Sequence, residues 1–167
     1  MGAVALGAVA GVAGAGVAAQ RAGALPLGPA GKPFKLGIDV RGWRLQVQGK
    51  AKGEPLAQGD RAAVFGELLG GGRKIGEFYS TSVFVGAPMG VGPHSAAYVE
   101  THHFNLEEGT LLGSGTARPA GPADYAVIGG TGRYAGATGS YSAIQNPIEL
   151  GGDGSATFNF NLVLQET

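Results

Sequence analysis

Hydrophobic and polar residues alternate with a period of two along most of the chain after residue 42. The first such run covers 43–48, where Trp43, Leu45 and Val47 alternate with arginine and glutamine, and the last covers 156–164. Period-two alternation is typical of a half-buried β-strand, whose successive side chains point to opposite faces. No segment after residue 42 keeps helical spacing over about ten residues or more. The pattern therefore predicts an all-β domain.

Glycine-containing turns join these runs into hairpins. Residues 61–69 lead through three glycines into 75–85, and residues 98–106 lead through Glu-Glu-Gly into 110–116. Further short runs are expected at 125–128, 140–144 and 156–164. About eight short strands joined by tight turns are typical of a β-sandwich or of an up-and-down barrel, and strand spacing alone leaves both open.

The first 24 residues have a different composition, with almost only Ala, Gly and Val before Arg21. Such a stretch resembles the apolar part of a secretory signal, with small-residue cleavage candidates at 17–19 and 22–24. Because no basic residue follows Met1, an uncleaved anchor and a flexible tail stay open, and about 20 apolar residues are long enough for an anchor. We expect a secreted or cell-envelope protein, with an N-terminal membrane anchor as the alternative.

Residues 25–42 are rich in proline and glycine and are expected to be a linker to a barrel domain over 43–167. The whole chain of 167 residues is 44% hydrophobic and 14% charged, which is enough to bury one core. Its 12 basic residues balance 12 acidic ones without a basic block, so nucleic-acid binding is not expected. The lack of cysteine excludes disulfides, thiolate metal sites and cysteine nucleophiles.

The glycine-rich segment 125–141, Tyr-Ala-Val-Ile-Gly-Gly-Thr-Gly-Arg-Tyr-Ala-Gly-Ala-Thr-Gly-Ser-Tyr, resembles the signature loop of the allene oxide cyclase and dirigent superfamily. Gly59-Asp60 and the hairpins around 70–76 and 101–115 agree with it in order, so the resemblance covers roughly 45–164. It implies an eight-stranded antiparallel β-barrel, often trimeric. The apolar cavity of such a barrel steers cyclisation or coupling of a reactive small molecule without a cofactor.

Glu100 and His102 are candidates for acid–base chemistry because residues two apart on a strand share a face. A carboxylate beside a histidine can relay a proton near neutral pH. A half-exposed polar strand face or a subunit contact is the alternative interpretation. His103 points to the opposite face, so the two histidines do not bind one metal together, and no metal site is expected.

Arg133 and Tyr134 lie inside the matched loop and are candidate catalytic residues that orient a substrate or polarise its carbonyl. Plant allene oxide cyclases place a carboxylate and an amide in their first barrel strand. The comparable residues here, Gln46 and Gln48, are expected to hydrogen-bond a substrate without exchanging a proton. Two further polar-tipped residues are expected near the barrel mouth and are assigned to substrate binding: Tyr125 and Tyr141.

Two other site types fit the sequence poorly. Gly130, Gly132 and Gly136 match part of a dinucleotide-binding fingerprint, but the following segment alternates like a strand where that site needs a helix. Positive φ angles at barrel corners explain these glycines better. Ser114 lies between two glycines within a strand pattern, which does not fit the nucleophile turn of a serine hydrolase.

These observations leave two classes of function. The first is a cofactor-free cyclase or isomerase that folds a flexible apolar substrate and steers ring closure or stereoselective coupling. The second is a non-catalytic exported barrel that binds an apolar ligand or acts in assembly, because a fold alone does not establish an activity.

Both faces of one strand carry apolar residues, as the run Val83-Phe84-Val85 shows. In a monomeric barrel one of these faces meets water and is polar. We therefore expect a homo-oligomer, a trimer or a dimer, whose contacts bury part of the outer surface. The alternative is a leader or linker that folds back over this face.

Overall fold

The computed structural model describes residues 31–51, 54, 57–86, 97–117 and 121–165, so the predicted leader lies outside the described residues and stays a prediction. The strands are β1 Lys32–Val47, β2 Arg61–Gly70, β3 Arg73–Gly86, β4 Ala97–Leu106, β5 Gly109–Ala117, β6 Ala123–Gly130, β7 Thr138–Asn146 and β8 Ser155–Leu164. Two short 3-10 turns complete the described elements, η2 at Gly132–Tyr134 and η3 at Ile148–Leu150. Within these ranges no helix is long and apolar enough to cross a membrane.

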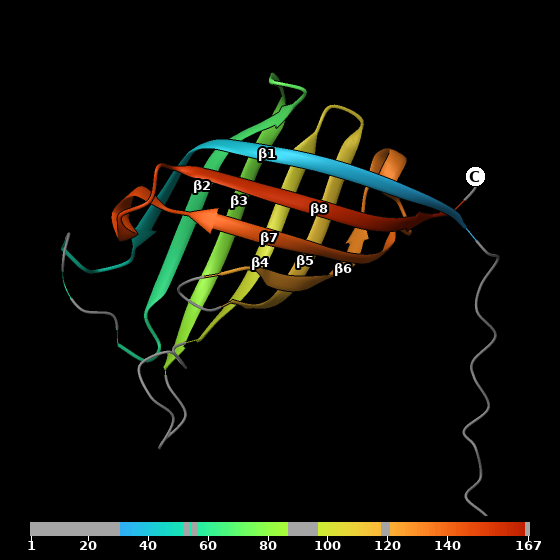
Figure 1. Ribbon diagram of the computed structural model, residues 1–167. Coiled ribbons are helices and arrows are strands. Elements are labelled where there is room, and N and C mark those ends of the chain that lie inside the picture. The colour runs from blue at the N-terminus through green and yellow to red at the C-terminus, as the bar shows by residue number, and fades with distance from the viewer. Residues whose placement is uncertain (1–30, 52–53, 55–56, 87–96, 118–120, 166–167) are drawn as a thin grey trace, which may run out of the picture.

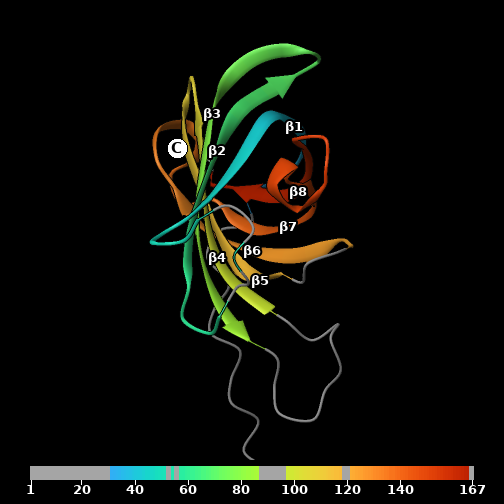
Figure 2. The ribbon, with the colours of Figure 1, turned by 90° about the vertical axis from the view of Figure 1, so that its left-hand side faces the viewer.

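Each strand pairs antiparallel with the next one, and β8 pairs with β1, so the sheet closes on itself. The strands wrap around a common interior in both views (Figures 1 and 2). The prediction of an eight-stranded antiparallel β-barrel is confirmed, and the sandwich is excluded. Closure gives every strand two partners and leaves no sheet edge exposed.

The predicted hairpins are confirmed, and glycine is required at their turns. Gly71 and Gly72, between β2 and β3, have φ of 57° and 79°, a left-handed backbone that other residues rarely adopt. The loop between β6 and β7 contains η2 and no longer helix, as expected from the alternating segment that follows it. Its backbone is tied to the β4–β5 hairpin, because the Arg133 N–H donates to the Glu108 carbonyl at 2.9 Å.

The predicted start of the barrel at Trp43 is wrong, because residues 32–42, expected to be linker, form the first part of β1. Their side chains alternate too, with Ile38 and Val40 fully buried. The pairing of β1 with β2 shifts register between Arg41 and Arg44, where Gly42 has φ of 67°. This β-bulge lets Val40 and Trp43, three residues apart, both point inward. It therefore interrupts the period-two pattern and hides the continuity of the strand.

The interior changes character along the barrel axis. We call the end where β2, β4, β6 and β8 begin the Tyr98 end, and the opposite end the Tyr134 end. Around the middle, closely packed aromatic rings fill the interior: Phe78, Phe104, Phe158 and Phe160. Towards the Tyr98 end five of the buried inward side chains are small, beside the large Trp43 and Tyr125: Ala62, Ser82, Ala117, Ala143 and Ala156. We call the closely packed aromatic rings the aromatic floor and these five residues the small-residue wall.

Candidate functional site

A buried polar cluster lies on the inner wall between the aromatic floor and the Tyr98 end. Its members are Glu100 and His102 on β4, Tyr125 on β6, and Tyr141 and Gln145 on β7. We call these five residues the Glu100 cluster. The prediction that Glu100 and His102 share a face is confirmed: both are buried, while His103 is exposed.

Two hydrogen bonds and one close contact with a histidine converge on one carboxylate oxygen of Glu100. The Tyr125 hydroxyl donates to Oε2 at 2.5 Å, and Nε2 of Gln145 donates to it at 3.2 Å. Nε2 of His102 lies 3.3 Å from the same oxygen. Burial by itself raises the pKa of the Glu100 carboxyl, but His102 and the two hydrogen bonds outweigh burial and lower that pKa below its ordinary value. Glu100 is therefore an ionised carboxylate at neutral pH, held inside an apolar barrel.

The two tyrosines of the cluster are neutral donors. Burial, together with the negative charge of Glu100, raises the pKa of both phenols far above the ordinary value. The Tyr141 hydroxyl lies 2.9 Å from Nδ1 of His102, and a protonated phenol donates to that nitrogen. The other ring nitrogen then carries its proton towards Glu100. A continuous chain of polar groups therefore runs from Tyr141 through His102 to the carboxylate.

Stacked rings and one glycine hold the cluster in place. The rings of Tyr125 and Tyr141 stack with centroids 5.0 Å apart and planes within 9°, and the His102 ring lies 4.5 Å from that of Tyr125. Gly113 on β5 leaves the space that the Tyr141 ring occupies, since a Cβ there would lie 2.1 Å from the Tyr141 hydroxyl. Sequence reasoning missed Gly113 and Gln145, although the inward parity of Gln145 relative to Tyr141 was available as a signal.

The lowered pKa of Glu100 makes the stability of the barrel sensitive to acid. A carboxyl whose pKa is lower in the folded state stabilises the fold above its unfolded pKa, and this contribution is lost as the pH falls through the folded value. We expect the free energy of unfolding to decrease in urea titrations taken from about pH 7 to about pH 3. Glu100→Gln is expected to flatten this decrease, and Glu107→Gln, at an exposed position, is expected to leave it unchanged. Parallel pH curves for the wild type and Glu100→Gln would contradict the assignment.

The structure separates the other predicted site residues from this cluster. Arg133 is exposed beyond the Tyr134 end, where its guanidinium bonds Glu108 at 2.5 Å and lies 5.9 Å from the Phe34 ring centroid. Tyr134 is buried beside it in η2. The structure therefore does not bring these two candidate catalytic residues together with Glu100 and His102, and their role stays a prediction. The β6–β7 loop closes the barrel end opposite to the one where β4 begins.

Gln46 and Gln48 are exposed on the outer side of the barrel, while Leu45 and Val47 turn inward. The structure therefore places the two glutamines outside the barrel interior, and their assignment to substrate binding stays a prediction. Tyr125 and Tyr141, by contrast, are inside, although deeper than the mouth where they were expected.

A narrow hollow opens beside the cluster at the Tyr98 end. Its wall includes Leu45, Val47, Ser82, Phe84 and Tyr98, and its volume is about 10 Å³. Ser82 is the cross-strand partner of Glu100, so the hollow lies next to the carboxylate. Its volume holds about one water molecule. A larger ligand can reach Glu100 along this route only if the lining side chains move.

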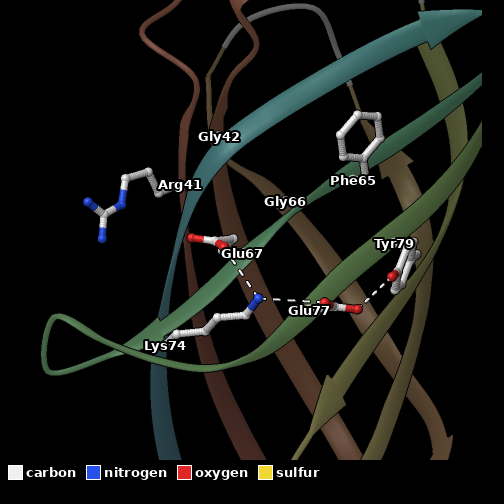
Figure 3. A pocket seen from close by; sticks show the side chains of 8 residues that line it. All are labelled: Arg41, Gly42, Phe65, Gly66, Glu67, Lys74, Glu77 and Tyr79. Atoms are coloured by element: carbon white, nitrogen blue, oxygen red, sulfur yellow. Dashed lines mark hydrogen bonds and ion pairs between the residues drawn. The ribbon is translucent and has the colours of Figure 1, made fainter.

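A second hollow of about 280 Å³ lies on the outer surface beside the β1 bulge (Figure 3). Phe65 and Tyr79 form its aromatic wall and are 48% and 44% exposed. Lys74 lies 3.3 Å from a Glu67 oxygen and 3.6 Å from a Glu77 oxygen, and the Tyr79 hydroxyl donates to Glu77. Over the part of the chain that the structure describes, no three His, Cys, Asp or Glu side chains gather where they could hold a metal ion.

No family model and no curated protein matches the sequence, but solved structures match the fold. The chain is similar to a pyocyanin demethylase with a TM-score of 0.62 and 18% identity, covering 78% of this chain and 100% of that one. It is similar to the pterocarpan synthase dirigent protein PsPTS1 with a TM-score of 0.64 and 12% identity, covering 83% and 99%. The Diels–Alderase AbmU from Streptomyces koyangensis matches with a TM-score of 0.63 and 15% identity, covering 81% and 69%. This chain has the same barrel fold.

Proposed function

We propose that the protein is a cofactor-free cyclase or isomerase of small, largely apolar molecules, of the kind that the allene oxide cyclase and dirigent resemblance implies. The observation that carries the proposal is the ionised Glu100, which accepts two hydrogen bonds inside an apolar barrel and lies 3.3 Å from Nε2 of His102. Buried titratable pairs of this kind concentrate at functional sites. The solved barrels named above include a dirigent protein and a Diels–Alderase, which supports the proposal at the level of the fold.

In this proposal the barrel does two kinds of work. Its aromatic floor and small-residue wall hold a flexible substrate close to its reactive shape, which supplies rate through proximity and orientation. Glu100 accepts a proton from the substrate and returns it at another substrate atom, while His102, 3.3 Å from the carboxylate, holds that group in place. The composition of the molecule is unchanged, and both side chains end in their starting protonation states. The neutral phenols of Tyr125 and Tyr141 donate their single protons to Glu100 and His102, so they hold these two groups in position for the transfer.

The test replaces the carboxylate and leaves the barrel intact. Native mass spectrometry with a small-molecule extract of the producing organism identifies a bound ligand, and chromatography then measures its conversion. We expect Glu100→Gln to slow conversion by about a hundredfold or more, the size of effect that loss of a general acid–base group has. Glu107→Gln, on the exposed β4–β5 turn, is expected to convert at the wild-type rate. Equal rates for Glu100→Gln and wild type would refute the catalytic assignment.

The tight packing of the described interior favours one alternative, a non-catalytic barrel. Aromatic rings fill the middle of the barrel, and the described hollow at the Tyr98 end holds only about one water molecule. In that case the extract yields either no bound ligand or a ligand that is recovered unchanged. Unaltered product ratios against a control without protein would favour this alternative over the enzyme.

We also propose that the barrel forms a homo-oligomer through its outer surface. Phe65 and Tyr79 are cross-strand partners on β2 and β3, and Val99 lies further along the sheet on β4. Each is more than two-fifths exposed, so the outer surface carries several large apolar side chains that a subunit contact would bury. We expect light scattering at micromolar concentration to give the mass of a dimer or a trimer. Val99→Lys is expected to shift that mass towards the monomer with the fold retained. A monomeric wild type would overturn this proposal.

We also propose that the protein is exported, because residues 1–24 resemble a secretory signal. It would then act outside the cytoplasm. Fractionation of the producing cells tests it. We expect the protein in the medium or the cell envelope, with residues 1–24 absent from the mature protein if the segment is a cleaved signal.

A further inference from the structure

Three buried polar side-chain atoms have no hydrogen-bond partner among the described residues. One of them, Nε2 of His102, lies 3.3 Å from a Glu100 oxygen. The other two are Nε1 of Trp43 and Oε1 of Gln145. The Trp43 side chain is 3% exposed, so water does not reach its N–H from outside. Buried donors and acceptors are nearly always paired, because leaving them unpaired costs free energy. Their presence beside a candidate active site therefore calls for a physical reason.

The two residues lie on either side of the same strand, β8. The Trp43 backbone N–H donates to the Gly154 carbonyl at 2.9 Å, just before β8 begins. Gln145 on β7 is the cross-strand partner of Ala156 from the other side. The only inward side chain between them on β8 is the methyl group of Ala156, which is buried. The indole and the amide thus both belong to buried or half-buried side chains on either side of this small residue, and Val40, its other cross-strand partner, is buried beside it.

The Gln145 amide is oriented by the cluster. Its Nε2 donates to Glu100 at 3.2 Å and to the Tyr125 hydroxyl at 2.8 Å. The opposite orientation would place the amide oxygen against an ionised carboxylate, which repels it. Oε1 therefore points away from Glu100 and accepts hydrogen bonds, whereas the Trp43 indole only donates them. Together the two side chains offer one donor and one acceptor to the barrel interior.

We propose that Trp43 and Gln145 form a polar subsite for a ligand that carries both a carbonyl and a hydroxyl group on an unsaturated or aromatic body. The carbonyl oxygen accepts the indole N–H of Trp43, and the hydroxyl donates to Oε1 of Gln145. The Phe78 ring, whose centroid lies 6.3 Å from that of Trp43, packs against the apolar body. This inference rests on the proposed function and specifies the substrate class of the same site.

The subsite also links binding of the ligand hydroxyl to Glu100, the proposed catalytic carboxylate. Gln145 holds the ligand hydroxyl through Oε1 and the Glu100 carboxylate through Nε2 of the same amide. A ligand that engages Gln145 is thereby placed at a constant position relative to Glu100. A site built to hydrogen-bond a hydroxyl discriminates strongly against analogues that lack it, because its own buried polar atoms then stay unpaired. Gln145 is therefore a positioning and specificity residue in this proposal.

The test uses Trp43 as its own reporter, because it is the single tryptophan of the chain. The indole N–H gives one resonance in a ¹H–¹⁵N correlation spectrum, so it needs no assignment. The probes are 3′-hydroxyacetophenone and 4′-hydroxyacetophenone, with acetophenone, 4-ethylphenol and ethylbenzene as analogues that lack the hydroxyl, the carbonyl or both. We expect at least one hydroxyacetophenone to move the indole resonance saturably, and to bind more tightly than the three analogues.

Variants then assign the two contacts. Trp43→Phe keeps a ring against Phe78 and is expected to weaken binding of the responsive probe about threefold to tenfold, the effect of one hydrogen bond. Gln145→Leu is expected to weaken it similarly and to remove the preference for the hydroxyl group. Gln46→Leu, on the outer surface, is expected to bind like the wild type. An indole resonance that no probe moves, or that ethylbenzene moves equally, overturns the subsite without relying on any variant.

Failure of this subsite and failure of the proposed function give different results. If Glu100→Gln abolishes conversion of the natural ligand while no probe moves the indole resonance, the function stands and the subsite is wrong. If the probes bind through Trp43 and Gln145 but Glu100→Gln converts the natural ligand at the wild-type rate, the subsite stands and the catalytic assignment is wrong.

Discussion

Replacing His102 with alanine is expected to lower the free energy of unfolding by about 3–5 kcal/mol, the range for truncating a large, fully buried side chain to alanine. The ring of His102 is fully buried between Phe78, Phe104 and Phe158 and touches both Glu100 and Tyr141. The variant leaves a cavity among these rings, a phenol without its acceptor and a carboxylate with one donor fewer. Urea unfolding followed by circular dichroism measures the loss.

The adjacent histidine provides the matched control. His103 is exposed on the outer side of the same strand, so His103→Ala is expected to change the free energy of unfolding by no more than about 0.5 kcal/mol. The two variants differ only in the face of β4 from which the imidazole is removed. Losses of equal size for the two would mean that β4 does not present Glu100 and His102 to the interior.

Replacing Gly113 with alanine is expected to cost about 3 kcal/mol or more, at the upper end of the range for overpacking a core. The new Cβ would lie 2.1 Å from the Tyr141 hydroxyl and 2.4 Å from a ring carbon, and the Tyr141 ring is fully buried. Tyr141 has to leave its position and lose its hydrogen bond to His102. Chemical denaturation measures the stability, and loss of near-ultraviolet circular dichroism reports the displaced rings.

A second glycine in a strand tests whether this cost comes from the contact with Tyr141. At Gly37 on β1 an added methyl group would meet one atom within 4 Å, an Asn159 oxygen at 3.8 Å, so Gly37→Ala is expected to be nearly neutral. Adding Tyr141→Phe to Gly113→Ala removes the closest overlapping atom and is expected to recover part of the loss. A Gly113→Ala variant as stable as Gly37→Ala would contradict the packing described for Tyr141.

Part of the candidate site could be predicted from the sequence. Glu100 and His102 were found because spacing along one strand is sufficient to show that their side chains share a face. Tyr125 and Tyr141 were selected as polar-tipped residues, but their stacking and their contacts with Glu100 depend on how β4, β6 and β7 come together. The contacts of Gln145 cannot be predicted from local spacing, because its partners lie 45 and 20 residues away in the chain.

The two loop residues show where a motif misleads. Arg133 and Tyr134 lie in the segment that carries the family resemblance, and they were assigned to the site for that reason. Alternate loops of an antiparallel barrel close opposite ends, so the β6–β7 loop lies away from the end where β4 begins. The glycines of this loop have a structural role: Gly132 and Gly136 have φ of 58° and 70°, and the loop is tied to the β4–β5 hairpin.

The sequence by itself determined the strands, their hairpins and the inward or outward direction of most side chains. These features are local. Alternation with a period of two sets the direction of side chains within one strand, and a glycine with positive φ sets the turn at its own position. Tertiary structure decided the rest. Pairing of β8 with β1 closed the barrel, and the bulge at Gly42 joined two out-of-phase halves of one strand. The same closure brought Glu100, Tyr125 and Gln145 within hydrogen-bond distance, since contacts between distant strands depend on the register of every strand between them.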